Sequence, residues 1–103
     1  MAWQVKWTEV AQDDLDKIAS YIAKDSENYA AAFVREVLDA ARSLEQLAQR
    51  GRMVPEWHDM SIRELIVRNY RLIYQLEQPT ASIIGVVHGA RDLEVLWRRE
   101  GRR

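Results

Sequence analysis

The spacing of the apolar residues predicts one strand, then two helices, then three more strands. At the start of the chain, Trp3, Val5 and Trp7 alternate with the polar residues Gln4 and Lys6. This alternation is typical of a strand that buries one face. We therefore expect the fold to open with a half-buried strand over residues 2–7.

Two stretches of helical periodicity come next. Thr8 and Ser26 each precede such a stretch and can act as N-caps, and Arg50 followed by Gly51 is a common helix stop. The expected apolar positions are Val10, Leu15, Ile18 and Ile22 in the first helix, and Phe33, Val37, Ala40, Leu44 and Leu47 in the second. Because only a few residues separate the two helices, we expect an antiparallel helical hairpin.

Strand patterns return after a loop over residues 51–61. The segment 62–76 reads as two strands joined by a tight turn at Arg68-Asn69, where Asn69 can adopt the left-handed conformation. The segment 81–89 is almost entirely apolar, as expected of a central strand covered on both faces. Residues 91–103 predict a short helix or a final strand, followed by a basic tail over residues 98–103.

These elements predict a single α+β domain over residues 1–103. An N-terminal strand and an antiparallel two-helix hairpin precede a three-strand antiparallel meander, and the helices pack on one face of the sheet. On the strand that begins at Tyr70, the apolar set Tyr70, Leu72, Tyr74 and Leu76 shares a face. Arg71 is then expected on the opposite, uncovered face together with Ile73 and Gln75.

Composition narrows the class of protein. The chain has no cysteine, so it can form neither disulfides nor thiolate metal sites, and we expect a cytoplasmic protein with no metal and no cofactor. No run of 18 apolar residues is present, so we expect no membrane span. The net charge is −1, and all nine basic residues after Gly51 are arginine. This mild asymmetry does not by itself identify a nucleic-acid-binding protein.

Four short motifs follow one another over nearly the whole chain: A-x-x-D-L-x-x-I-A-x-Y-I, GR-x-V-P-E, IREL-x-V-x-x-YR-x-IY and VHG-x-RD. In this order and spacing they resemble the RelE/ParE toxin superfamily. The matching residues are Ala11, Asp14, Leu15, Ile18, Ala19, Tyr21, Ile22, Gly51, Arg52, Val54, Pro55, Glu56, Ile62, Arg63, Glu64, Leu65, Val67, Tyr70, Arg71, Ile73, Tyr74, Val87, His88, Gly89, Arg91 and Asp92.

The resemblance implies the toxin of a type II toxin–antitoxin system, with two possible activities. RelE-like members cleave mRNA on the ribosome by using lysines, two arginines and a tyrosine. Arg71 and Arg91 match the arginines, but no lysine stands on the strand before Arg71, and the segment where the tyrosine is expected offers Trp97. If the chain were a ribonuclease, Arg71, Arg91 and His88 would be its candidate catalytic residues.

ParE-like members instead poison DNA gyrase. Two arginines that suit a phosphate, without a group to move protons, favour binding over catalysis. We therefore expect a ParE-like toxin that inhibits DNA gyrase. The alternatives are a divergent RelE-like ribonuclease and an inactive member that only binds its antitoxin. The candidate target-binding residues are Arg63, Arg71, Arg91, Trp97, Arg98 and Arg99.

The resemblance also implies a partner, a ParD-like antitoxin that forms a hetero-oligomer with the toxin. Such antitoxins wrap their toxins with an extended, partly helical segment. On the second helix, Tyr29 and Val34 are candidate antitoxin-binding residues, and ordinary packing at the edge of the core is the alternative for both. For the tail over residues 98–103, the alternative to target binding is a solvated chain end.

Overall fold

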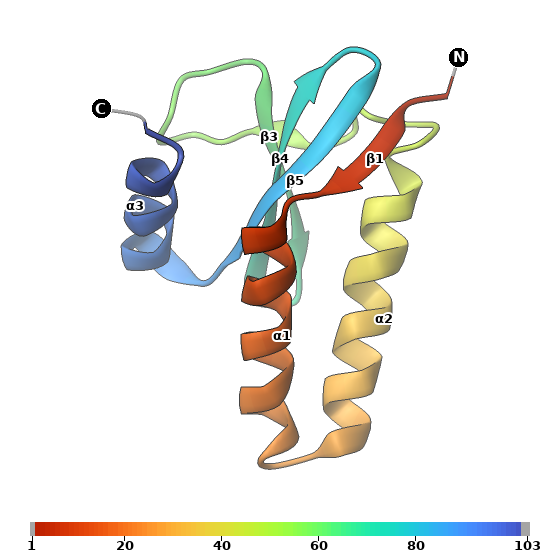
Figure 1. The fold of residues 1–103 in the computed structure, drawn as a ribbon, viewed down its shortest axis with the longest axis vertical. Helices are drawn as coiled ribbons and strands as arrows, with labels where there is room; N and C mark the ends of the chain where they lie inside the picture. The colour runs from red at the N-terminus through yellow and green to blue at the C-terminus, as the bar shows by residue number, and fades with distance from the viewer. Residues whose placement is uncertain (1, 102–103) are drawn as a thin grey trace.

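The computed structural model describes residues 2–101 and contains a five-stranded sheet and three helices (Figure 1). The strands are β1 (Gln4–Trp7), β2 (Arg52–Met53), β3 (Ile62–Val67), β4 (Tyr70–Glu77) and β5 (Thr80–Val87), and the helices are α1 (Glu9–Ala23), α2 (Glu27–Ser43) and α3 (Gly89–Arg99). The strand order is β1-β5-β4-β3-β2, with β1 parallel to β5 and every other pair antiparallel. The predicted α+β class and the β3–β4–β5 meander are therefore confirmed.

The predicted helical hairpin is present, and both helices begin where their caps indicated. The Thr8 hydroxyl accepts a hydrogen bond from the Ala11 amide (3.2 Å), and the Ser26 hydroxyl accepts one from the Tyr29 amide (3.1 Å). Each cap satisfies an amide that the first turn of a helix leaves without a partner. In Figure 1, α1 and α2 run side by side, and the turn that joins them projects beyond the sheet.

The prediction that the second helix continues to Arg50 is wrong. α2 ends at Ser43, and Leu47 lies beyond it with 61% of its surface exposed. The carbonyl of Glu45 accepts a hydrogen bond from the Trp3 amide (2.8 Å) instead of one from a further helical turn. The segment after Ser43, which the apolar spacing predicted to be helical, therefore binds the chain just before β1 instead of continuing the helix.

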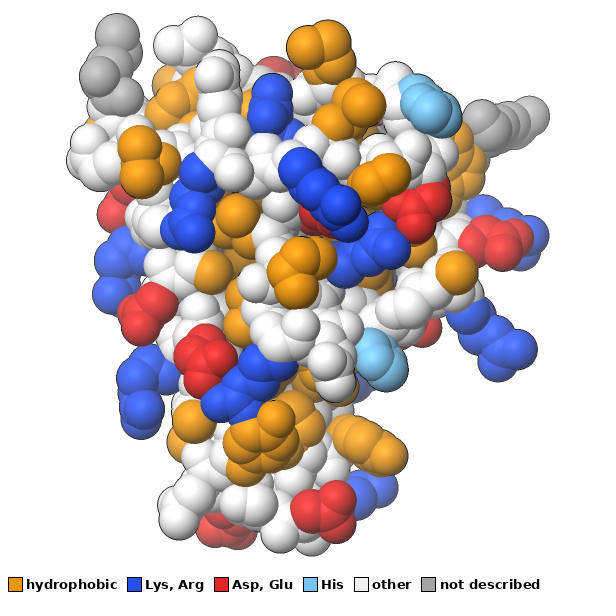
Figure 2. Space-filling model, turned by 180° about the vertical axis from the view of Figure 1, so that it is seen from behind, with side chains coloured by type: hydrophobic (Ala, Val, Ile, Leu, Met, Phe, Trp, Pro, Cys, Tyr) orange, Lys and Arg blue, Asp and Glu red, His pale blue; other side chains and the backbone are white. Residues whose placement is uncertain are grey.

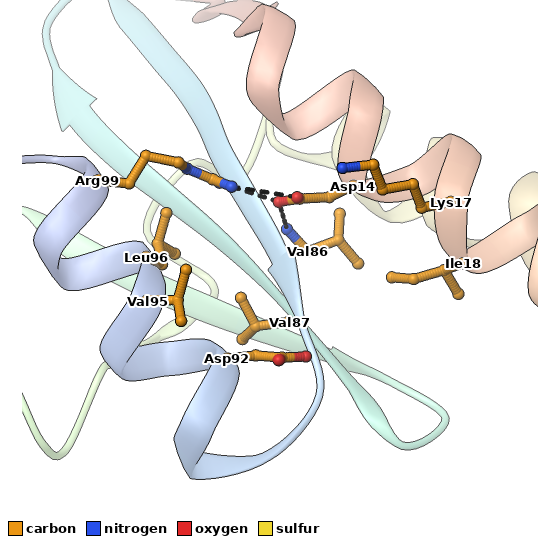
Figure 3. A pocket seen from close by; sticks show the side chains of 9 residues that line it. All are labelled: Asp14, Lys17, Ile18, Val86, Val87, Asp92, Val95, Leu96 and Arg99. Carbon is orange, nitrogen blue, oxygen red and sulfur yellow. Dashed lines mark hydrogen bonds and ion pairs between the residues drawn. The ribbon is translucent and has the colours of Figure 1, made fainter.

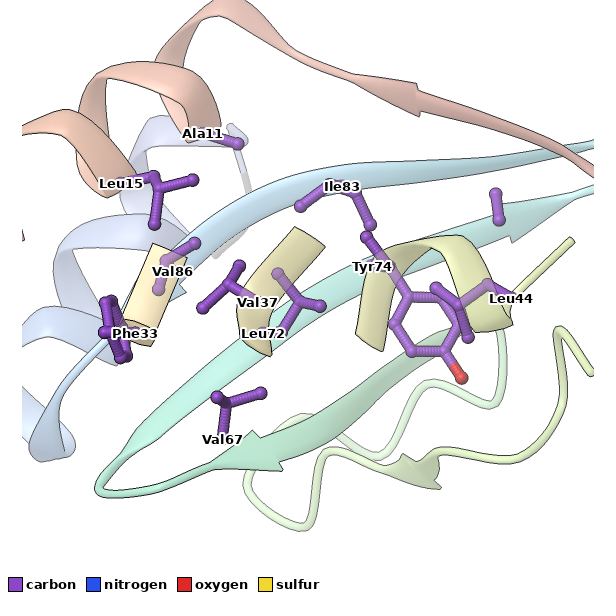
Figure 4. Packing of buried hydrophobic residues seen from close by; sticks show 12 residues of the cluster. Ala11, Leu15, Phe33, Val37, Leu44, Val67, Leu72, Tyr74, Ile83 and Val86 are labelled. Carbon is purple, nitrogen blue, oxygen red and sulfur yellow. The ribbon is translucent and has the colours of Figure 1, made fainter. Parts of the chain in front are cut away.

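The first hydrophobic core lies between the hairpin and one face of the sheet, as expected. In Figure 4, Leu72 and Tyr74 point from β4 toward the second helix of the hairpin, with Leu72 beside Val37 and Tyr74 beside Leu44. The buried members of this core are Ala11, Leu15, Phe33, Val37, Ala41, Leu44, Val67, Leu72, Tyr74, Ala81, Ile83 and Val86. Full burial of each large side chain contributes about 1.5–3 kcal/mol, which makes this core the main source of stability.

The opposite face of the sheet is not uncovered, contrary to the prediction. α3 and the segment 54–57 pack on it and form a second core of Val54, Trp57, Ile62, Ile73, Ile84, Val87, Leu93 and Leu96. The helices therefore lie on both faces of the sheet. Strand alternation places Ile62 and Ile73 on this face, and burying them requires a covering element, which α3 provides through Leu93 and Leu96.

The packing of α3 depends on an irregularity in β5. The register between β4 and β5 shifts at Ile73 and Tyr74, so Ile84 has no partner on β4 and Gly85 follows it. A Cβ atom at Gly85 would lie 2.8 Å from Cδ2 of Leu96, a distance too short for two carbon atoms. Glycine at this position thus lets α3 lie directly on the strand.

The remaining boundaries agree with the sequence in part. A tight turn joins β3 and β4 as predicted, but its residue with positive φ is Arg68 (φ 57°) rather than Asn69. The Arg68 side chain pairs with Glu36 on α2, which holds the turn against the hairpin. β2 was not predicted. Over the described residues, no helix is both long and apolar enough to cross a membrane.

Candidate functional site

Four charged side chains meet on the sheet face that α3 covers. Arg71 of β4 donates two hydrogen bonds to Glu56 (3.0 and 3.1 Å) and one to Glu64 of β3 (3.2 Å). Arg52 of β2 donates from Nε to the other carboxylate oxygen of Glu64 (2.6 Å). Two arginines and two glutamates from four neighbouring segments therefore form one ion-pair network, which we call the Arg–Glu network.

The Arg–Glu network is partly buried, so its ion pairs matter for the stability of the fold. The Glu64 side chain has no exposed surface, so its carboxylate needs a cation, and Arg52 and Arg71 each provide one. The hydrogen bonds from Arg71 hold the pKa of Glu56 below its ordinary value, and Glu56 in turn raises the pKa of Arg71. The positive charge of Arg71 is therefore compensated within the protein. An outward-looking arginine on a bare sheet face, as the sequence suggested, is not what the structure contains.

Arg63 does not join Arg71, although both were predicted to contact the same target. Arg63 pairs in register with Tyr74, on the hairpin side of the sheet, and donates to the carbonyls of Gln49 (3.3 Å) and Gly51 (2.9 Å). Its Nε is buried and has no hydrogen-bond partner among the described residues. Arg63 thus binds the backbone of the loop that leads from α2 to β2.

The end of β5 lies beside Arg71 and leads directly to His88 and Arg91. Val87 pairs in register with Arg71, and α3 begins immediately afterwards at Gly89, which has a positive φ of 85°. The His88 ring stacks at a tilt on Tyr70, with 4.9 Å between ring centroids. Arg91 is exposed in the first turn of α3 and has no ion pair or hydrogen bond within the described part of the chain.

The three other predicted residues of the C-terminal segment belong to α3 and are held by contacts. Trp97 packs against Trp57 with 5.1 Å between ring centroids. Arg98 pairs with Glu94 one turn earlier (2.7 Å), and both side chains are exposed. Arg99 crosses to α1 and pairs with Asp14 (3.0 and 3.2 Å), which raises the pKa of Arg99. Residues 98 and 99 are therefore helical, and residues 102–103 of the predicted tail lie outside the described residues.

On the hairpin, the two candidate antitoxin-binding residues differ in exposure. Tyr29 is half exposed, and the Arg68 guanidinium lies over its ring at 4.2 Å from the centroid. Val34 is partly buried and packs against the first core. The hairpin also exposes two further large apolar side chains, Tyr21 and Leu38. The hairpin thus offers more apolar surface than the sequence singled out.

The charges of the sheet face are mixed. Figure 2 shows the side of the molecule opposite to that of Figure 1, on which basic, acidic and apolar side chains are interleaved rather than gathered into one basic patch. Within residues 2–101, no group of three or more His, Asp or Glu residues could hold a metal ion. The surface thus suits contact with a protein that presents both charges and apolar groups better than contact with phosphates alone.

Comparison with known proteins identifies the family. The family model described as "ParE toxin of type II toxin-antitoxin system, parDE" matches residues 5–93. The chain belongs to the ParE toxin family. This ParE-family toxin is similar in fold to a chain of the solved structure titled "Chromosomal ParDE TA system from P. aeruginosa". The match covers 86% of this chain and 98% of that one, with a TM-score of 0.71 and 21% sequence identity. No curated protein sequence matches the toxin.

Sequence reasoning did not assign roles to four residues that hold the site of this ParE-family toxin together. These four residues, which all stand within the family motifs, are Arg52, Glu56, Glu64 and Asp14, and their partners lie on other elements. A sequence can indicate such residues when a charged side chain stands at a position that the strand or helix period assigns to the buried face. Glu64, two residues after Ile62, is an example. Strand periodicity places Glu64 on a buried face, where a carboxylate needs a cation.

Proposed function

We propose that this ParE-family toxin arrests growth by binding DNA gyrase and inhibiting it, without catalysing a reaction of its own. The observation that carries the proposal is the state of Arg71. Two carboxylates compensate its charge, and one of them, Glu64, is completely buried. An arginine held in this way stabilises the fold by pairing with buried carboxylates. Its charge is then not available to neutralise a phosphate in a transition state.

Two tyrosines of the sheet are poorly suited to move a proton. Cleavage of RNA by its own 2′-hydroxyl needs a base near the attacking oxygen and an acid near the leaving oxygen. The Tyr74 hydroxyl donates to the Ala48 carbonyl (2.8 Å) and accepts from the Gly51 amide (3.0 Å). Burial raises the pKa of Tyr74 and also that of Tyr70, against which His88 packs. These contacts favour the gyrase-directed activity over a ribonuclease activity.

The proposed target surface consists of exposed cations on the side of the sheet that α3 covers. Arg91 and Arg98 are exposed there, and Arg52 keeps 62% of its side chain exposed although it binds Glu64. Three of the other candidates are held by contacts within the chain: Arg71 by Glu56 and Glu64, Arg99 by Asp14, and Trp97 by Trp57. Arg63 binds the loop that leads from α2 to β2. Exposed arginines beside apolar groups are favoured at protein interfaces.

The proposed neutralising partner is a ParD-like antitoxin, which would form a hetero-oligomer with the toxin in the cytoplasm. Tyr29 and Val34 remain the proposed antitoxin contacts on α2. The exposed apolar residues of the hairpin support this proposal, because apolar surface of this kind marks interaction sites.

An assay with purified components tests the proposed target. Toxin added to gyrase and relaxed plasmid should inhibit supercoiling or accumulate cleaved DNA without ribosomes. The antitoxin, added first in equimolar amount, should abolish the effect. Ribosome-dependent cleavage of mRNA with unaffected gyrase would overturn the proposal in favour of a RelE-like activity. Antitoxin binding without either effect would indicate an inactive member of the family.

A further inference from the structure

Arg52 uses its guanidinium differently from Arg71 and Arg99. Arg71 donates from both terminal nitrogens, Nη1 and Nη2, to carboxylates of its own chain. Arg99 does the same with Asp14, and the two side chains form a clamp between α3 and α1 (Figure 3). Arg52 donates only from Nε, to Glu64 (2.6 Å), and its terminal nitrogens have no hydrogen-bond partner within residues 2–101. Arg52 therefore presents an unoccupied fork of two nitrogens.

The buried carboxylate of Glu64 holds this fork in place. The Glu64 side chain has no exposed surface, whereas 62% of the Arg52 side chain is exposed. Because a guanidinium is planar and rigid, the bond at Nε also restricts where the two terminal nitrogens lie. An ordinary surface arginine loses rotamer freedom when it binds a partner, but Arg52 has already lost part of that freedom in the folded protein. Arg52 is thus ordered for binding in advance.

An exposed apolar side chain lies next to Arg52 on the same face of the sheet. Arg52 pairs in register with Glu64, and Ile66 stands two residues further along β3, so its side chain points to the same face. Such diagonal neighbours lie about 7–8 Å apart. β2 is only two residues long and does not reach Ile66, which is 57% exposed. Arg52 and Ile66 therefore form an exposed pair, which we call the Arg52–Ile66 patch.

Free hydrogen-bonding capacity, not net charge, decides what the patch can bind. The Arg–Glu network contains two cations and two anions, so it is neutral as a whole. Both oxygens of Glu56 accept from Arg71, and Glu64 is buried, whereas the fork of Arg52 is free. Two parallel N–H donors match the two oxygens of a carboxylate. Phosphate binding usually draws on several gathered cations, and an arginine beside an apolar side chain is typical of protein interfaces.

We propose that Arg52 is the anchor by which the toxin recognises its protein target. Its two terminal nitrogens bind the carboxylate of an aspartate or glutamate on gyrase, and Ile66 contacts an apolar side chain beside that acid. The inference rests on the proposed function and names the group on the target that this surface binds. Glu64 is then a positioning residue, because it acts on the target only through Arg52.

A competing carboxylate at position 66 tests the anchor while Arg52 and Glu64 stay in place. Ile66→Glu puts an acid beside the fork, and Ile66→Gln has the same shape without the charge. Binding to purified gyrase without DNA should be weaker for the glutamate variant than for the glutamine variant by about tenfold or more. Leu38→Glu and Leu38→Gln, at a position on α2 that is 41% exposed, are the matched control pair and should differ by less than about twofold.

Arg52→Lys provides the second arm, because lysine supplies a cation for Glu64 but not the fork. It should bind gyrase about fivefold or more weakly than wild type, and thermal unfolding should show that the variants remain folded. Equal binding of Ile66→Glu and Ile66→Gln, or wild-type affinity of Arg52→Lys, overturns the anchor. A loss seen only when gyrase carries DNA identifies a phosphate and overturns the carboxylate. If wild-type toxin does not bind gyrase, the proposed function itself is wrong and this inference falls with it.

Discussion

Nη1 of Arg71 lies 3.2 Å from Oε1 of Glu64, a side chain with no exposed surface. Arg71 belongs to the strand motif by which the family is recognised, and its first contacts are with carboxylates of its own chain. The structure therefore gives this arginine a structural task in addition to any contact with a target. Substitutions at Arg71 will affect folding and function together, so they need controls that separate the two.

The two arginines that hold Glu64 should depend on each other energetically. After Arg52→Ala or Arg71→Ala alone, Glu64 keeps one cation, and we expect each change to destabilise the fold by about 1–2 kcal/mol. The double variant leaves a buried carboxylate without a cation and should cost about 1–2 kcal/mol more than the sum. Urea denaturation of the four proteins measures this coupling. In a Glu64→Gln background it should disappear, and additive costs in the parent background would contradict the network.

Glu56 should contribute to stability only above acidic pH. Its pKa is lowered in the folded protein, chiefly by the hydrogen bond from Arg71, from an ordinary value of 4.5. The contribution is therefore complete above pH 4.5 and is lost as the pH falls through the lower, folded pKa. Because the Glu56 side chain is 44% exposed, solvent screening limits the effect to about 0.5 kcal/mol. Thermal unfolding of Glu56→Gln against wild type should differ at pH 7 and converge near pH 3. An equal difference at both pH values would point to packing instead of charge.

Arg99 and Arg98 should respond differently to removal, although they are neighbours. Arg99→Ala breaks the clamp with Asp14 and the bond to the Ile84 carbonyl, and we expect it to cost about 1–3 kcal/mol. Arg98→Ala breaks only an exposed pair and should cost less than about 0.5 kcal/mol. Chemical denaturation of the two variants provides the comparison.

The same contacts of Arg99 separate two truncations of the chain end. Removing the chain from residue 98 onward also removes Arg99 and should destabilise the toxin, whereas removing it from residue 100 onward should not. Only the shorter truncation therefore tests whether the chain end contributes to toxicity.

Arg91 offers the cleanest test of target binding near α3. It is exposed and unpaired within the described residues, so Arg91→Ala should change the free energy of unfolding by less than about 0.5 kcal/mol. If Arg91 contacts the target, growth arrest at equal expression should weaken markedly while antitoxin binding is unchanged. Arg42→Ala, which removes an exposed arginine on α2, is the control. Equal toxicity of the two variants would remove Arg91 from the proposed surface.

The amino-acid sequence by itself determined the elements whose signals are local. Capping residues and alternation are read from neighbouring positions, so Thr8, Ser26 and the alternating face of β4 were correctly interpreted. The burial of β5 on both faces also followed from its apolar run, because a strand covered on both faces contains few polar residues. The order of the motifs indicated the ParE family, which the family comparison confirmed.

Only the tertiary structure decided which residues meet. Glu64 and Arg52 are twelve positions apart, and Asp14 and Arg99 are 85 positions apart, so no local period could pair them. The bulge beside Gly85 and the packing of α3 place Leu96 and Arg99 over β5 and turn an expected open face into a second core. The sequence alone does not show whether an arginine is solvated or pairs with a buried carboxylate. Packing between segments that are distant in the sequence determines which of the two occurs.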